Sequence, residues 1–414
     1  FFIELILLNS WLAGQGMRCN KKLVLAVFDE TGRGVLTKKK IYAGEELMNL
    51  PLSSTINVTT ILMDTDFCTL FLDNSKQCLV EYKNKVSFQS LMALYLVYLK
   101  LQGSSNKWFV YLESLPKEYT VPYFLPNNLK CLIDSNLIAV IEKQKDIIDT
   151  SFHIFEDILK SNENIKNICS VKNLKENFEL CVYEWAYFTV NTRCVYMDLS
   201  RVVDLENVDN SILSLINDSM KISLCPYLDM INHKLFTEIS FSIYTKNNFD
   251  PYTQVFICYG DSHNSKLITE YGFFLSGNEL DYVSFNFEDV LDYLSTKAIK
   301  LSQDQLAFIN SHGLNKDLYI DIRGMSFNFY GLLMVVKYYY DRTTDVSRLI
   351  YSAAICSDDR LLIELITPMV NKKLTNIDES IRELRSYNSE CIILNNCVEL
   401  MCQYINILEK FIKC

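Results

Sequence analysis

The pattern of apolar and polar positions divides the chain into strand-like and helix-like stretches. Residues 22 to 51 hold short apolar runs, KLVLAVF, VLTKKKI and ELMNLP, separated by turn residues. This pattern predicts short strands, with DETGRG at 29 to 34 forming one turn. From about residue 87 the spacing becomes helical, as in SFQSLMALYLVYLKLQG, and it predicts helices up to about residue 200.

The strand-like pattern returns in EISFSIYT and QVFICYG, and a short helix is expected in HNSKLITEYGFF. From about residue 287 the pattern is mostly helical and ends in a strongly periodic run from 378 to 412. The sequence therefore predicts an α+β fold in three parts. These are a helical lead-in at 1–21, a β unit at 22–275 split by a helical insertion at about 87–200, and an all-helical C-terminal domain at 287–414.

Composition narrows the class of protein. The chain has 414 residues, of which 49% are hydrophobic and 22% charged, as in a globular protein with ample core. A net charge of −10 argues against direct nucleic-acid binding and weakly favours a basic protein partner. We expect no membrane association, since no apolar run is long enough to span a bilayer. The first residues, FFIELILLNSWLAG, predict a helix that leads into Trp11 rather than a signal peptide.

The cysteines predict a compartment and argue against one kind of site. The chain has 14 cysteines, most of them in apolar helical runs, and no CxxC pair. This pattern predicts reduced core cysteines in a cytosolic or nuclear protein, and it gives no support for structural zinc. We therefore expect no metal site and a cytoplasmic and/or nuclear location.

Four short motifs carry candidate chemistry, and each is ambiguous by itself. The glycines of TGRGVL let a ligand approach the backbone, but they also suit an ordinary turn. CPYLDMINHK places Asn232 beside His233, where a structural role, as a core histidine or a capping asparagine, is as good an interpretation as a functional one. FTVNTRCVY ends an apolar helix with Arg193, which could be a capping arginine. Tyr259 and Tyr271 follow a predicted strand and a short helix, in a chain with 25 tyrosines.

The order of these motifs resembles that of the SET-domain methyltransferases, in particular the subgroup typified by the Rubisco large-subunit methyltransferase. The stretches that carry the resemblance are GRGVLTKKKIYAGEELMNLP, YLESLPKEYTVP, WAYFTVNTRCVY, CPYLDMINH and VFICYGDSHNSKLITEYGFF. They cover about residues 8 to 285. The helical C-terminus resembles the substrate-binding domain of that subgroup in position and pattern. The resemblance implies a SET β-core with a pseudoknot, and S-adenosylmethionine as the cofactor.

The resemblance also implies roles for individual residues. Asn232 and His233 would hold the adenine and amino-acid ends of the cofactor. Arg33 and its neighbour Gly34 would contribute backbone contacts to it.

Further residues would complete the site by the same resemblance. Arg193 and Asp229 would frame it, with Arg193 near the cofactor carboxylate, a pairing that suits guanidinium geometry. Phe273 would pack at the cofactor edge. Tyr259 would lie nearest the transferring methyl, and Tyr271 would line the substrate channel.

The residue types that the resemblance implies suit methyl transfer to a lysine. A free lysine has a pKa of about 10.4, so the neutral amine costs about 4 kcal/mol near pH 7.4. An apolar channel beside a cationic cofactor lowers such a pKa by up to about 3–5 units, so no carboxylate base is needed. Tyrosine hydroxyls orient an amine without holding its proton. The sequence thus predicts a protein-lysine N-methyltransferase acting on a protein that presents a lysine, with a basic histone tail as one candidate.

Two alternatives stay open at this point. One is a protein-histidine N-methyltransferase of the same fold, which Val195 mildly disfavours because it offers an imidazole no hydrogen bond. The other is an inactive SET-type module that binds proteins, which the joint presence of Asn232, His233 and Tyr259 disfavours. The remaining histidines are expected to be exposed or capping residues, namely His153, His263 and His312.

Overall fold

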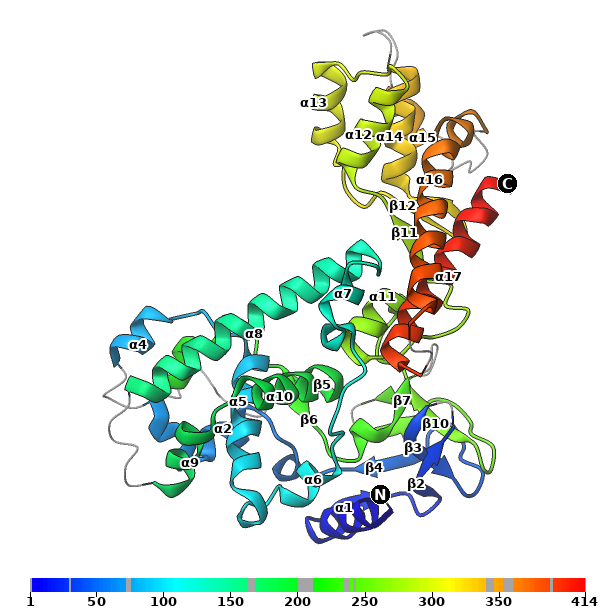
Figure 1. The fold of residues 1–414 in the computed structure, drawn as a ribbon. Helices are drawn as coiled ribbons and strands as arrows, with labels where there is room; N and C mark the ends of the chain where they lie inside the picture. Colours follow the sequence, from blue (N-terminus) through cyan, green and yellow to red (C-terminus); the bar gives the residue numbers. More distant parts are fainter. Residues whose placement is uncertain are drawn as a thin grey trace. The chain divides into compact units, whose positions relative to one another are not determined.

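The structure is a computed structural model that describes residues 2–29, 31–71, 76–161, 168–199, 211–233, 239–240, 243–339, 346–352, 360–387 and 390–413. The chain forms two compact units (Figure 1). The first consists of Phe1–Tyr119 and Glu142–Asp261, and the second of Thr120–Ile141 and Ser262–Cys414. The three parts expected from the sequence are a different division of the chain and stay a prediction.

Helix α5 (Phe88–Leu101) lies at the centre of the helical part of the first unit. Nearly all of its side chains are buried, as expected for a helix that is apolar on every face. It contacts α6 (Phe109–Ser114), α9 (Cys169–Asn177) and α10 (Leu180–Arg193). The other helices that contribute to this unit are α1 (Phe2–Gly14), α2 (Val58–Met63), α3 (Thr65–Cys68), α4 (Lys76–Glu81) and α8 (Ser135–Ser161). The helical insertion predicted from the change of period is thus present.

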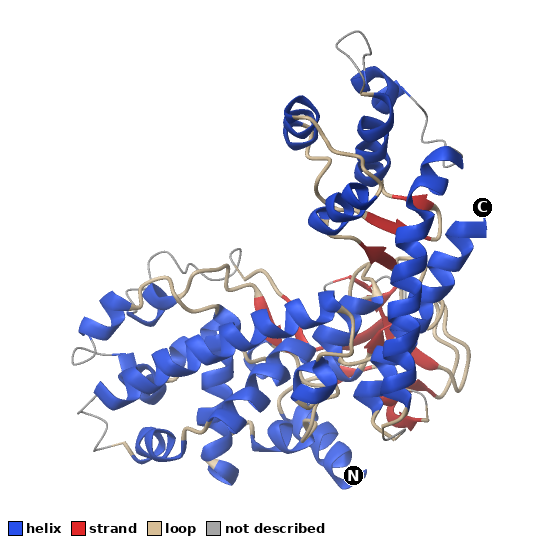
Figure 2. Cartoon of the chain, turned by 45° about the horizontal axis from the view of Figure 1, so that its top comes forward, coloured by secondary structure: helices blue, strands red, loops and turns tan. Residues whose placement is uncertain are grey.

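The strands of the first unit form small sheets, drawn in red in Figure 2. In one sheet, β2 and β10 pair antiparallel with β3 on either side, and β7 runs parallel to β10. A second sheet has the order β1-β4-β9-β8, and β5 pairs with β6. The bounds are β1 Arg18–Cys19, β2 Leu23–Phe28, β3 Gly32–Thr37, β4 Glu46–Asn49, β5 Cys194–Tyr196, β6 Ile222–Leu224, β7 Asn232–His233, β8 Ile239–Ser240, β9 Ile243–Thr245 and β10 Gln254–Ile257.

The glycine pair of TGRGVL lies in a strand, which corrects the prediction of a turn from 29 to 34. β3 begins at Gly32, and its register with β2 pairs Gly32 with Phe28 and Gly34 with Ala26. The turn is therefore shorter than predicted. Glycine is needed in β3 because other side chains occupy the space beside it, as described below for Gly34.

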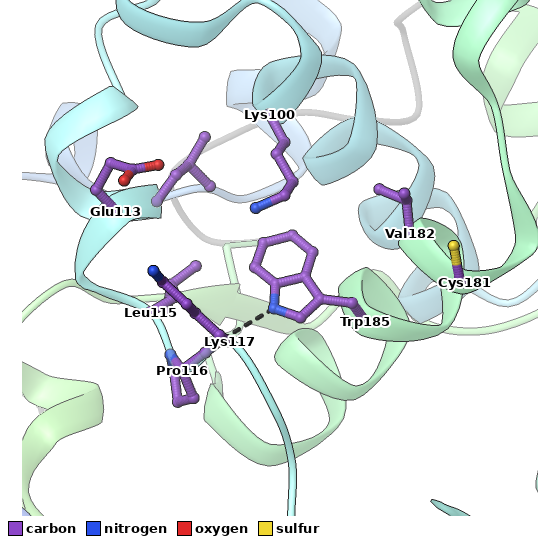
Figure 3. A pocket seen from close by; sticks show the side chains of 9 residues that line it. Lys100, Glu113, Leu115, Pro116, Lys117, Cys181, Val182 and Trp185 are labelled. Carbon is purple, nitrogen blue, oxygen red and sulfur yellow. Dashed lines mark hydrogen bonds between the residues drawn. The ribbon is translucent and has the colours of Figure 1, made fainter.

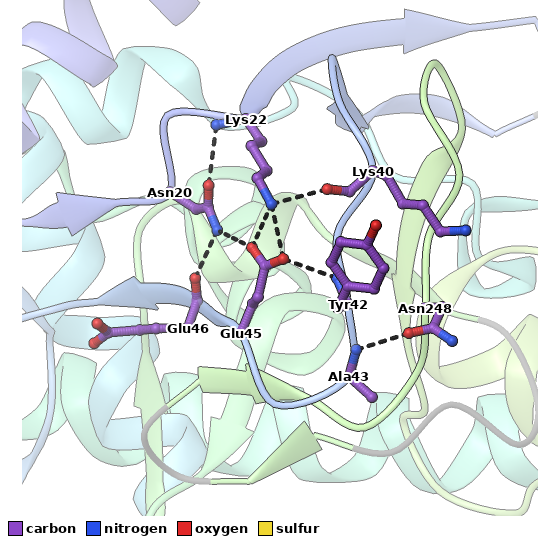
Figure 4. Close-up of polar contacts among 8 residues, drawn as sticks. All are labelled: Asn20, Lys22, Lys40, Tyr42, Ala43, Glu45, Glu46 and Asn248. Carbon is purple, nitrogen blue, oxygen red and sulfur yellow. Dashed lines mark hydrogen bonds and ion pairs between the residues drawn. The ribbon is translucent and has the colours of Figure 1, made fainter.

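A polar cluster braces the turn that leads into β4 (Figure 4). Lys22 Nζ lies 2.6 and 2.7 Å from the two carboxylate oxygens of Glu45, and it donates to the Lys40 carbonyl at 2.8 Å. The backbone N–H of Tyr42 also donates to Glu45, at 3.0 Å. The Lys22 ammonium, followed by the Tyr42 N–H, holds the pKa of the Glu45 carboxyl below its ordinary value. The cluster thus ties the start of β2 to the start of β4.

The second unit is mostly helical, but it also contains a three-stranded sheet, which corrects the expectation of an all-helical C-terminal domain. The sheet consists of β11 (Tyr282–Ser284), β12 (Tyr319–Asp321) and β13 (Gly324–Met325). Strands this short do not produce a readable alternation in the sequence. The helices are α7 (Asn127–Lys130), α11 (Asn264–Lys266), α12 (Phe287–Thr296), α13 (Gln303–Ser311), α14 (Phe327–Tyr338), α15 (Val346–Ser352), α16 (Arg360–Arg385) and α17 (Ile392–Lys413).

The last periodic run is two helices rather than one. It falls on α16 and α17, which lie side by side (Figure 1). The break between them lets both apolar faces pack against each other, which a single straight helix could not do. Within the described part of the chain, no helix has both the length and the apolar character needed to cross a membrane.

The predicted core position of the cysteines is only partly correct. Cys225 and Cys397 are buried, but Cys131, Cys169 and Cys181 are exposed. A largely apolar helix on the surface still has one side that faces water, so a cysteine in an apolar run need not be buried.

Candidate active site

Asn232 and Gly34 bring two distant segments together in the first unit. Asn232 begins β7, and its side-chain amide donates to the carbonyl of Arg33 at 2.9 Å. A Cβ on Gly34 would lie 2.5 Å from the amide nitrogen of Gln254 and 3.0 Å from that of Asn232. Any larger residue at Gly34 would therefore collide with the side chains that join β3, β7 and β10.

His233 fixes the backbone of Tyr259. The N–H of Tyr259 donates to His233 Nδ1 at 2.9 Å, and the two rings lie 5.2 Å apart. Because a backbone N–H can only donate, His233 Nδ1 must be unprotonated, which places the ring proton on Nε2. Burial lowers the pKa of His233, so the ring is neutral at pH 7. The Tyr259 hydroxyl donates to the carbonyl of Ile231 at 2.8 Å, which fixes the direction of its lone pairs.

Arg193 and Asp229 form a buried ion pair. Arg193 Nη1 lies 3.3 Å from Asp229 Oδ2 and 3.1 Å from the Asp229 carbonyl oxygen, and the Asp229 side chain has 0% exposure. The hydroxyl of Tyr111 donates to the same carboxylate oxygen at 2.9 Å. Arg193 ends α10, Asp229 lies in the short helix η8 (Leu228–Met230), and Tyr111 comes from α6.

The electrostatics of this pair reflect its burial. Burial raises the pKa of the Asp229 carboxyl, while the Arg193 guanidinium and the Tyr111 hydroxyl oppose that rise. Burial is the largest single influence on Arg193 and acts to lower its pKa, but the Asp229 carboxylate and the hydroxyls of Tyr119, Tyr111 and Tyr259 together outweigh it, so the net shift is upward. The pKa of the Tyr111 hydroxyl is raised, first by burial and then by the Asp229 charge. Tyr111 is therefore a permanent hydrogen-bond donor to Asp229.

A second arginine gives the cluster a surplus of positive charge. Arg33 is close enough to Arg193 for its pKa to be lowered, mainly by burial and then by that neighbouring charge. Its guanidinium donates to the carbonyl of Ser114. Two guanidinium groups thus lie near the one buried carboxylate of Asp229, and the Glu4 carboxylate acts more weakly on Arg33. Among the described residues, Arg193 Nε and Asp229 Oδ1 are buried without a hydrogen-bond partner.

Tyr271 and Phe273 lie in the second unit. Tyr271 ends a π-helical turn, η9 (Leu267–Tyr271), and its ring centroid lies 6.2 Å from that of Phe273. Gly272 between them has a positive φ of +79°. Their predicted place beside Tyr259, which belongs to the first unit, stays a prediction.

Comparison with known proteins places this geometry in a known fold. No protein-family model matches the chain. It is 28% identical over 420 residues to SET domain-containing protein 4 of Artemia parthenogenetica, covering 97% of this chain and 95% of that protein. It is 26% identical over 324 residues to the Homo sapiens protein of the same name, covering 76% of this chain and 68% of that one. The SET domain of LSMT bound to lysine and AdoHcy superposes with a TM-score of 0.60 at 15% identity, over 100% of this chain and 91% of that chain. The chain has the SET-domain fold.

The resemblance inferred from the motif order is thus confirmed, including the particular likeness to SET domain-containing protein 4 that the motifs suggest. Two further relatives differ in their acceptor. A ribosomal lysine N-methyltransferase of Schizosaccharomyces pombe is 23% identical, covering 77% of this chain and 71% of that protein. An actin-histidine N-methyltransferase of Drosophila melanogaster is 25% identical, covering 51% of this chain and 41% of that protein.

The SET-domain motifs cover a further residue that was not among the predicted site residues. Tyr111 lies in YLESLPKEYTVP, one of the stretches that carry the resemblance. Its partner Asp229 is 118 residues away, so no local spacing connects them. The signal in the sequence was the motif itself, which includes Tyr111.

The other histidines of this SET-domain chain serve local structure. His263 caps α11, since its side chain accepts from the backbone N–H of Lys266 at 3.3 Å. His153 and His312 are exposed. The described ranges contain no cluster of three or more metal-ligating side chains.

A surface cavity of about 450 Å³ lies in the helical insertion (Figure 3). Trp185 forms part of it, with its indole N–H bonded to the Pro116 carbonyl at 2.9 Å and Lys100 Nζ 4.1 Å from its ring. None of the predicted site residues lines this cavity, which is lined by Lys100, Leu112, Glu113, Leu115, Pro116, Lys117, Cys181, Val182 and Trp185. The cluster around Arg193 and Tyr259 is therefore a separate feature.

Proposed function

We propose that this protein is an S-adenosylmethionine-dependent protein-lysine N-methyltransferase. The observation that carries the proposal is the convergence, within the first unit, of a cationic buried cluster and an oriented tyrosine hydroxyl. Arg33, Arg193 and Asp229 form the cluster, and Asn232 and His233 join it to β10, which Tyr259 follows. The SET-domain fold and the relatives described above support the same assignment.

The residues present fit the cofactor. Its amino-acid end carries a carboxylate, and the cluster offers two guanidinium groups against one carboxylate, with Arg193 Nε buried and unpaired among the described residues. Arg193 would hold the cofactor carboxylate while Asp229 keeps the guanidinium in place. Asn232 would contact the cofactor through its backbone and its amide, and Arg33 and Gly34 would contact it through their backbone, which the Asn232 amide holds by donating to the Arg33 carbonyl. When bound, the cofactor supplies an electrophilic methyl group on a sulfonium.

Tyr259 is placed to orient an amine. Its proton is donated to the Ile231 carbonyl, so its oxygen acts as an acceptor. A lysine amine can donate to that oxygen while its own lone pair points elsewhere. A tyrosine carries no charge at pH 7, so it does not stabilise the ammonium form. Orientation in line with the breaking bond is the main requirement of a methyl displacement.

The choice of lysine over histidine rests on two observations. LSMT, which has the same fold, has been solved with lysine bound. Val195 in β5 provides no hydrogen bond to an imidazole. The likeness to the actin-histidine enzyme keeps histidine as the alternative acceptor. The protein substrate would present its target residue on a basic segment, with a histone tail as one candidate, since the chain carries a net charge of −10.

Calorimetric titration with S-adenosylmethionine tests the cofactor site. We expect the intact chain to bind with a Kd in the micromolar range, and we expect Asn232→Ala to raise that Kd at least about tenfold. A chain that binds neither S-adenosylmethionine nor S-adenosylhomocysteine would be a SET-shaped interaction module instead.

Labelling with tritiated S-adenosylmethionine then tests the acceptor. The panel contains core histones, ribosomal proteins and actin, and the labelled proteins are hydrolysed to amino acids. Radioactive methyl-lysine supports the proposal, whereas radioactive methyl-histidine would replace it with the alternative. A Tyr259→Phe sample provides the control for label that does not depend on the site.

A further inference from the structure

The Tyr271–Phe273 segment turns at a residue that must be glycine. Gly272 has a φ of +79°, and its N–H donates to the carbonyls of Leu267 and Ile268 at 3.0 and 3.1 Å. A Cβ at Gly272 would lie 2.7 Å from Thr120 Oγ1 and 2.9 Å from the backbone carbonyl carbon and oxygen of Thr120. The Thr120 backbone is thus packed directly against this turn.

Two side chains from distant parts of the second unit hold the carbonyl of Gly272. Thr120 Oγ1 donates to it at 2.9 Å, and the side-chain amide of Asn396 donates to it at 3.0 Å. A carbonyl oxygen has two lone pairs, so these two donors satisfy it fully. Asn396 lies on α17, which also packs against the turn that follows Thr120, η5 (Pro122–Phe124).

The chain after this turn is fixed independently. Asn264 Oδ1 accepts from the N–H of Leu275 at 2.7 Å, and its amide donates to the Leu275 carbonyl at 2.8 Å. Asp281 holds Asn264 in turn, at 2.7 Å, and both residues are almost fully buried. Tyr271 ends η9 and Leu275 is anchored in this way, so the two bonds to the Gly272 carbonyl fix the peptide between Gly272 and Phe273 and with it the path of the chain from one ring to the other.

We infer that Thr120 and Asn396 are positioning residues that orient Tyr271 and Phe273 for methyl transfer. Their shared acceptor, the Gly272 carbonyl, links α17 of the C-terminal region to the segment predicted to line the substrate channel. The assignment of Tyr271 and Phe273 to the reaction rests on the proposed function. The two hydrogen bonds to the Gly272 carbonyl are observed in the structure and do not depend on that function.

Hydrogen exchange measured by mass spectrometry tests the two bonds without any substrate. The variants are Thr120→Val, Asn396→Ala and the double variant, with Thr120→Ser as the conservative rescue. Asn406→Ala, an exposed position on the same helix, is the matched control. We expect the peptide covering 267–275 to exchange about ten- to thirty-fold faster in the double variant, with the serine and control variants unchanged. Unchanged exchange in a folded double variant would overturn the inference.

Turnover on the acceptor found by tritium labelling tests the positioning role. The double variant should lose about ten- to a hundred-fold in kcat, while its Kd for S-adenosylmethionine changes by less than about threefold and Thr120→Ser retains activity. Faster exchange with an unchanged kcat would show that the bonds are merely structural, and would overturn the inference. If wild type labels no acceptor, the proposed function fails, and hydrogen exchange still decides whether the carbonyl is held.

Discussion

Deleting one hydroxyl, in Tyr111→Phe, should destabilise the first unit by about 2–3 kcal/mol. The Tyr111 hydroxyl donates at 2.9 Å to a carboxylate oxygen of Asp229, and both side chains are inaccessible to water. Hydrogen bonds to charged groups contribute about 1.5–3 kcal/mol, and the upper part of that range applies where no water can replace the donor. Phenylalanine keeps the ring, so no cavity forms and the change isolates the hydrogen bond.

The assay is reversible urea unfolding followed by circular dichroism and tryptophan fluorescence. Because the chain forms two units, a two-state fit is used only if both signals coincide, and otherwise each transition is fitted separately. Asp229→Asn and the double variant complete a double-mutant cycle, which gives the coupling energy between the hydroxyl and the charge. Tyr252→Phe, at a position with 78% exposure, is the matched control and should change stability by less than about 0.5 kcal/mol.

A coupling energy below about 0.5 kcal/mol would refute this reasoning, because it would mean that Tyr111 does not stabilise the Asp229 charge. The reasoning would also be refuted if Asp229→Asn left the free energy of unfolding almost unchanged. An uncompensated Arg193 should cost about 3–5 kcal/mol if the carboxylate is ionised in the folded chain.

Three further changes test the site and its surroundings. Tyr259→Phe should leave the calorimetric Kd for S-adenosylmethionine within about twofold but slow methyl transfer at least about a hundredfold, and equal turnover would move its role elsewhere. Gly34→Ala should destabilise the fold by about 1–3 kcal/mol in urea unfolding, since its Cβ would lie 2.9 Å from the Phe28 ring and 3.0 Å from the Asn232 amide, and an unchanged free energy of unfolding would contradict this packing. The pKa of Glu45 is lowered in the folded state, so its ionised carboxylate stabilises the fold. This contribution to the free energy of unfolding is at most about 1 kcal/mol; it is present above about pH 4.3 and is lost as the pH falls further. Glu45→Gln should remove this loss of stability at low pH. Urea unfolding curves recorded between pH 3 and 7 would measure it, with Glu46→Gln as the control variant.

The sequence by itself was enough to predict the helical insertion, the mainly helical C-terminal region and the motifs of the site, but not the helices α2, α3 and α4 that lie before α5. The change to helical spacing near residue 87 predicted the helical insertion, and in the structure nearly all side chains of α5 are buried. The resemblance to the SET domain came from motifs such as DMINH and YGF, whose residue types are specific in combination. Features with short range or no period were missed, including the strands β11 to β13 and the break between α16 and α17.

The contacts of the site were decided by the tertiary structure alone. No spacing in the sequence relates Tyr111 to Asp229 or Thr120 and Asn396 to Gly272, because each pair is joined only when distant elements pack. The same holds for the hydrogen bond by which His233 fixes the backbone of Tyr259, while its predicted contact with the cofactor stays a prediction. Local patterns determine which elements form, since they depend on neighbouring residues along the chain. Hydrogen bonds between buried groups depend on which elements meet, and that is set by the packing of the whole unit.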